Sequence, residues 1–127
     1  MRRMIFVTLG VLIAALALCT FANLRVTRFT DRARHLRTEA VMALDEGDVQ
    51  KAEVLLVELA GHLKANQALL EILCDHADLH ELKGELIDAQ ASIEFGIEDD
   101  FYQAIYRFGE MLDHIAGVEE LGISNFY

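Results

Sequence analysis

The fold of this chain is decided by residues 4–24, which read MIFVTLGVLIAALALCTFANL and contain no charged side chain. With a rise of about 1.5 Å per residue, a helix of this length spans roughly 30 Å, the thickness of a bilayer's hydrocarbon core. Arg2 and Arg3 precede the stretch, and Arg25 and Arg28 follow it, where long basic side chains reach lipid headgroups. The stretch therefore predicts a transmembrane helix, and we assign residues 1–24 to an N-terminal membrane anchor.

Two alternatives to a retained anchor were weighed for the same stretch. A cleaved signal peptide has a shorter apolar region, about 7–15 residues, and a small-residue cleavage site, for which 20–22 (Thr-Phe-Ala) is a weak match. Residues 16–19 (Leu-Ala-Leu-Cys) have the outline of a lipoprotein box, but Leu18 is too bulky for the position before a modified cysteine. We therefore favour an anchor that is retained.

The charge of the chain divides sharply after residue 37. Residues 1–37 hold seven arginines and one aspartate, whereas residues 38–127 hold four basic and twenty acidic side chains. We divide the chain accordingly into an arginine-rich juxtamembrane segment, 25–37, and an acidic domain, 38–127. Arg25, Arg28 and Arg32 are expected to contact lipid headgroups, at roughly 1 kcal/mol each near an anionic surface. The acidic domain is not typical of a nucleic-acid-binding protein.

The orientation of the anchor is left open by the positions of the arginines. Two arginines precede the span and five follow it, and this count favours an acidic domain in the cytoplasm. A short Arg-Arg segment before the first apolar stretch is instead typical of an anchor whose N-terminus stays inside.

The acidic domain shows helical periodicity and no sustained alternation of period two. We expect the first helix to continue from the membrane through Leu36 and Leu44 to a break at 46–48, where Asp48 caps the next helix. A second apolar stripe follows at helical spacing, formed by Ala52, Leu55, Leu56, Leu59, Ala60 and Leu63.

In the second half of the chain we predict one helix with a long apolar seam, followed by a last helix. Asn66 is expected to interrupt the helical pattern and to cap the helix that follows, and Gly96 is expected to end that helix. Asp99 or Asp100 is expected to cap the last helix, and residues 123–127 to form an apolar tail. The seam contains Leu69, Ile72, His76, Leu79, Leu82, Leu86, Ala89 and Ile93, and the last helix presents Phe101, Ala104, Ile105, Phe108, Leu112 and Ile115 to the core.

The acidic domain also contains a weak internal repeat. Residues 46–63 match residues 98–115 at an offset of 52, with an acidic cap, an alanine and an amphipathic face in each copy. This pattern indicates two stacked helical hairpins. The predicted fold is therefore all-α: an N-terminal transmembrane helix followed by an antiparallel bundle of about four helices.

The one cluster with possible chemistry is the segment 74–81. His76 and His80 are one helical turn apart, a spacing at which two imidazoles can share a metal ion. A zinc-protease helix would carry Glu after the first His, but Ala77 stands there. We interpret His76 as a buried structural histidine and keep metal binding as the alternative. Cys19 in the span and Cys74 in a helix are not expected to pair.

The order of these features resembles a bacterial family of small single-anchor helical proteins. That family is catalogued as a domain of unknown function, number four thousand three hundred and sixty-three. The resemblance implies an anchored helical domain outside the cytoplasmic membrane and supplies no activity. It rests on 48–52 (Asp-Val-x-x-Ala), His76, 98–100 (Glu-Asp-Asp), Glu119 or Glu120 with Leu121, and Asn125-Phe126.

The sequence contains no phosphate-binding loop, nucleophile elbow or paired metal motif, so we expect a protein that is not an enzyme and needs no cofactor. The predicted function is that of a structural or protein-interaction module at a bacterial cytoplasmic membrane, with its acidic domain outside. Its predicted partners are the lipid bilayer and an unidentified membrane or envelope protein. The alternatives are a metal- or small-ligand-binding bundle that uses His76 and His80, and a tetratricopeptide-like peptide-binding module.

Overall fold

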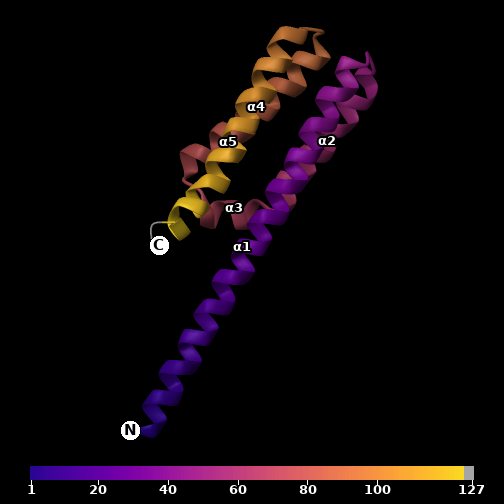
Figure 1. The fold of residues 1–127 in the computed structure, drawn as a ribbon. Helices are drawn as coiled ribbons and strands as arrows, with labels where there is room; N and C mark the ends of the chain where they lie inside the picture. Colours follow the sequence, from indigo (N-terminus) through magenta and orange to yellow (C-terminus); the bar gives the residue numbers. More distant parts are fainter. Residues whose placement is uncertain (125–127) are drawn as a thin grey trace.

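The chain folds into five helices, one of which extends far beyond the others (Figure 1). The computed structural model describes residues 1–124, except for the side chains of Leu73 and of residues 117–124. No strand occurs within this range, as the sequence predicts. The helices are α1 (Arg2–Asp45), α2 (Val49–Ala65), α3 (Gln67–Leu73), α4 (His76–Glu94) and α5 (Glu98–Ser124).

Helix α1 combines two environments along one unbroken backbone. It has 44 residues and is therefore about 66 Å long. Every side chain from residue 1 to residue 21 is exposed, and Val26 is the first that is buried. The expected continuation of the anchor helix through Leu36 and Leu44 is confirmed. Residues 25–37 do not form a separate segment between anchor and domain, because Phe29, Ala33 and Leu36 already belong to the bundle's core.

The bundle consists of two antiparallel hairpins, α1 with α2 and α4 with α5, as predicted. Figure 1 shows the hairpins side by side, and α1 packs on α5 while α2 packs on α4. Consecutive helices of the resulting up-down-up-down bundle enclose a single core. The largest fully buried side chains in it are Phe29, Phe101, Phe108, Leu36, Leu56, Leu59, Leu70, Leu82, Ile105 and Leu112.

The two hairpin turns have the same backbone structure. Gly47 and Gly96 adopt φ angles of +81° and +72°, a region in which glycine has no steric cost. In each turn the next N–H donates back to the helix, from Asp48 to the Ala43 carbonyl and from Ile97 to the Ser92 carbonyl, both at 2.8 Å. The turns therefore superpose at an offset of 49 residues, and the predicted offset of 52 is wrong.

Of the three helix caps that the sequence predicts, the structure confirms one. The carboxylate of Asp48 accepts from the Lys51 N–H at 3.1 Å, so this predicted cap is confirmed. Asn66 breaks the chain as expected, but its amide donates to the His62 carbonyl at 2.9 Å and closes α2 instead of capping α3. Asp99 and Asp100 are not caps, because α5 begins at Glu98 and both lie within its first turn.

The predicted seam from Leu69 to Ile93 is not one helix. The backbone is extended at Cys74 and Asp75, with ψ angles of 151° and 148°, and this break separates α3 from α4. Leu79, Leu82, Leu86, Ala89 and Ile93 are buried as expected.

Two members of that seam are outside the core. Ile72 is 82 % exposed and His76 is also exposed, so the interpretation of His76 as a buried structural histidine is wrong. Of the expected apolar tail, Ile123 and Ser124 belong to α5, and Asn125, Phe126 and Tyr127 lie outside the described residues.

Candidate functional site: the base of the bundle and the arginine face of α1

The base of the bundle is the end from which the exposed part of α1 departs, and it consists of residues 25–29, 62–66 and α3. His62 ties α2 to α1 there: its Nε2–H donates to the Phe29 carbonyl at 3.0 Å. The imidazole also stacks on the Phe29 ring, with centroids 4.9 Å apart and an interplanar angle of 15°. Because Asn66 closes α2 one turn later, the end of α2 is fixed beside the point where the apolar stretch of α1 ends.

His62 is a structural residue that sequence reasoning did not identify. In the internal repeat His62 corresponds to His114, and the structure gives the two residues different neighbours. The Nε2 atom of His114 lies 3.8 Å from a carboxylate oxygen of Asp78 in α4. The sequence did contain a signal for this role of His62. His62 and Asn66 are four residues apart at a helix end, and such residues share one helix face.

The arginines predicted to contact lipid differ in their surroundings. Arg25 is exposed and lies 5.8 Å from the centroid of the Phe21 ring, a cation–π distance one turn before the bundle. Arg28 is exposed as well. Arg32 lies 4.0 Å from a carboxylate oxygen of Glu58 in α2, with about half of each side chain exposed. Of these three arginines, Arg25 and Arg28 are therefore the two that lie within the base.

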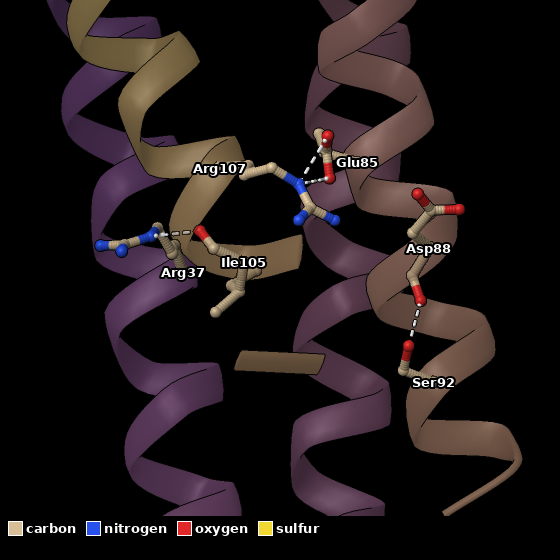
Figure 2. Close-up of polar contacts among 6 residues, drawn as sticks. All are labelled: Arg37, Glu85, Asp88, Ser92, Ile105 and Arg107. Carbon is tan, nitrogen blue, oxygen red and sulfur yellow. Dashed lines mark hydrogen bonds and ion pairs between the residues drawn. The ribbon is translucent and has the colours of Figure 1, made fainter. Parts of the chain in front are cut away.

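The next two arginines join α1 to α5. Arg34 forms an ion pair of 2.8 Å with Asp113. Arg37 donates from Nε to the Ile105 carbonyl at 2.9 Å (Figure 2). Gly109 provides the space, because a Cβ at this position would be 2.6 Å from both Nε and Cζ of Arg37. The sequence placed these arginines near lipid, but their partners are protein groups.

A third contact between α1 and α5 lies near the far end of the bundle. The Tyr102 hydroxyl donates to a carboxylate oxygen of Asp45. This hydrogen bond, partial burial and the charges of Asp45 and Glu98 raise the pKa of Tyr102 to about 12. On the exposed side of α5, a hydrogen bond with Glu110 raises the pKa of Tyr106. Tyr102 therefore keeps its proton, and with it the link to α1, throughout the ordinary pH range.

An open depression of about 410 Å³ lies between α4 and α5. At one end Arg107 donates from Nε to both carboxylate oxygens of Glu85 at 2.9 Å, and nearby the Ser92 hydroxyl donates to the Asp88 carbonyl at 2.7 Å (Figure 2). Each of these polar groups has its partner within α4 or α5. In the part of the chain that the structure describes, no buried side-chain nitrogen or oxygen lacks a hydrogen-bond partner.

The histidines considered as metal ligands lie in the first turn of α4. His76 and His80 are both exposed. Among residues 1–124, where side chains are described, no group of three or more His, Cys, Asp or Glu side chains is arranged to hold a metal ion. The histidine pair therefore gains no third ligand from a neighbouring helix.

Comparison of the chain with protein-family models, curated proteins and solved structures gave no match.

The close approach of Arg37 and Gly109 yields a stability prediction. Alanine in place of a helical glycine normally adds up to about 1 kcal/mol of stability. We expect this gain from Gly61→Ala, where a Cβ meets nothing within 4 Å, but not from Gly109→Ala, where it displaces the guanidinium. In an Arg37→Ala background, Gly109→Ala should recover the gain. Urea unfolding of the full chain in detergent measures all four variants, and equal gains at both glycines with Arg37 present would contradict the contact.

The raised pKa of Tyr102 predicts an alkaline loss of stability. The folded state holds the phenolic proton more tightly than the unfolded chain, so this contribution is complete below a pH of about 10 and is lost as the pH rises toward about 12. Tyr102→Phe should flatten the fall in unfolding free energy over this range. Tyr106→Phe is the comparison: a hydrogen bond with Glu110 raises the pKa of Tyr106 as well, but the group is exposed, so this variant should flatten the fall less. An unchanged slope in Tyr102→Phe would show that the hydrogen bond to Asp45 does not form in solution.

Proposed function

We propose that this protein is a membrane-anchored, non-enzymatic interaction module whose bundle is held by α1 at a fixed distance from the bilayer. The observation that carries the proposal is the continuity of α1, which supplies both the exposed apolar helix and one side of the bundle core. One helix of the described chain is long and apolar enough to cross a membrane, and none of its apolar stretch is buried in the protein.

The cost of leaving that stretch in water supports the membrane assignment. Full burial of a large aliphatic or aromatic side chain is worth about 1.5–3 kcal/mol, so a whole helix of such residues needs an apolar environment. The bundle does not provide one. The exposed large side chains along it are Met4, Ile5, Phe6, Val7, Leu9, Val11, Leu12, Ile13, Leu16, Leu18, Phe21 and Leu24.

The opposite end of the bundle supports a role in binding a partner. The turns at 46–48 and 95–97 lie about 30 Å beyond Arg25, measured along α1. Phe95 is 75 % exposed there, and Ile97 is about half exposed. The acidic first turn of α5 follows directly, so an exposed aromatic ring lies beside carboxylates at the greatest distance from the proposed membrane. A basic protein surface with an apolar pocket would complement this end.

For the orientation, we infer a bundle on the outer side of a bacterial cytoplasmic membrane. Of the five arginines that follow the span, Arg34 and Arg37 bond to α5 and Arg32 lies beside Glu58. Arg25 and Arg28 then remain to face headgroups after the span, and Arg2 and Arg3 do so before it. In the folded protein, equal numbers of arginines then remain at the two ends of the span, and the resemblance to the single-anchor bacterial family supports the outer side.

The two alternative functions receive no such support. A metal site needs a third ligand beside His76 and His80, and the described residues place none there. In a solenoid of the tetratricopeptide type, each repeat contacts only its neighbours and the stack leaves an open concave surface. Here the first and last helices, α1 and α5, pack directly together and close the bundle.

The membrane anchor is tested by a charge in the middle of the span. Leu12→Arg should reduce insertion, since an arginine at the centre of a transmembrane helix costs about 2.5–3.5 kcal/mol or more. The measurement is the fraction of full-length protein that stays with membranes after alkaline extraction. Ile87→Arg, on the exposed face of α4, is the matched control and should behave as the wild type. Equal extraction of the wild type and Leu12→Arg would contradict the anchor.

The orientation is tested separately with an epitope at the C-terminus. In intact bacterial cells expressing the protein, added protease should remove the epitope from the outer side of the cytoplasmic membrane once the outer barrier is permeabilised. Protection until the cytoplasmic membrane itself is opened would place the bundle inside and would contradict the orientation while leaving the anchor intact.

A further inference from the structure

We propose that α3 is a second membrane contact: its outer face, formed by Ala68 and Ile72, lies in the interfacial layer of the bilayer and seats the base of the bundle on the membrane. This inference rests on the proposed anchoring by α1. A contact through α3 would also give the bundle a defined orientation relative to the lipid surface.

The level of α3 along the molecule is fixed by the contacts of α2. His62 is bonded to the Phe29 carbonyl, and α2 runs antiparallel to α1. Asn66, one turn further along α2, therefore lies level with about residue 25 of α1. The uncharged stretch of α1 ends at Leu24. Helix α3 thus begins where the hydrocarbon core of the bilayer would end, and Figure 1 shows it crossing the base of the bundle.

The rotation of α3 about its axis is fixed by Leu70. This side chain is 1 % exposed and belongs to the bundle core. At about 100° per residue, Ala68 and Ile72 are centred on the side opposite Leu70. Both are exposed, and Ile72 at 82 % is more exposed than any other large apolar side chain that the structure describes between α1's apolar stretch and residue 116. The outward face of α3 is therefore apolar and points away from the bundle.

The bilayer is the occupant that best fits this face. The face lies at the level where the uncharged stretch of α1 ends, and the exposed cations Arg25 and Arg28 lie at the same level on α1, where anionic headgroups would meet them. Glu71 is the one carboxylate of α3, and it accepts from the Gln67 amide at 2.9 Å along the helix edge. An interfacial helix with this composition buries its apolar side chains at the boundary between headgroups and acyl chains.

The chain contains no tryptophan, so a single introduced tryptophan reports its own environment. The experiment compares three full-length variants in anionic phospholipid vesicles: Ile72→Trp on α3, Leu12→Trp in the span, and Ile87→Trp on α4 as the matched isoleucine control. Each is measured with plain lipid and with lipid brominated on the acyl carbons nearest the headgroup.

We expect Ile72→Trp to emit at shorter wavelength than Ile87→Trp and to lose fluorescence in brominated lipid, while Ile87→Trp loses none. If Leu12→Trp is quenched and Ile72→Trp is not, the inference on α3 is overturned and the anchor stands. If neither is quenched, the proposed anchor fails together with the inference. Quenching of Ile72→Trp and Ile87→Trp to the same extent would also overturn it, because the base would then be no closer to lipid than the side of the bundle.

Discussion

The structure depends on the unbroken hydrogen-bond ladder of α1. The same helix carries an exposed apolar surface over its first half and buries Phe29, Ala33 and Leu36 in the bundle over its second half. The chain has no proline, and the only glycine in α1 is Gly10, so neither residue type introduces a kink at the junction. Whatever fixes the direction of the apolar half therefore fixes the direction of the bundle.

The bundle strengthens this coupling by attaching its other helices to α1 at several heights. His62 binds α2 to the Phe29 carbonyl at the base, and Arg37 binds α5 near the middle. Tyr102 binds α5 to Asp45 close to the far turn. In each of these bonds one partner is a backbone or side-chain group of α1. A bundle attached to one continuous helix in this way is held rigidly relative to that helix.

The sequence predicted the architecture well because burial and turn chemistry are local signals. The apolar stripe of α2 and the core residues of α5 were read from helical spacing, and Asp48 and Gly96 marked real helix ends. The offset of the repeat was wrong because Asp48 was aligned with Asp100 through their shared acidity. The glycines at 47 and 96 set the turn geometry, and their spacing gives the true offset of 49.

The features that sequence missed depend on contacts between distant segments. The roles of Arg34 and Arg37 are set by Asp113 and by the space at Gly109, some seventy residues away in the chain. His76 matched the apolar spacing of a seam, but the break at 74–75 rotates the following helix and leaves it exposed. Periodicity alone carries no information about either effect.

The central claim is that one rigid helix joins membrane and bundle, and a distance across the junction tests it most directly. Spin labels at Leu16→Cys and Met42→Cys, in a chain with Cys19→Ser and Cys74→Ser, lie at exposed positions on the two halves of α1. Pulsed electron resonance in lipid nanodiscs should give a single narrow distance near about 39 Å, the length of 26 helical residues. A broad distribution, or a distance well below this value, would show that the helix bends or breaks at the bilayer and would contradict the account.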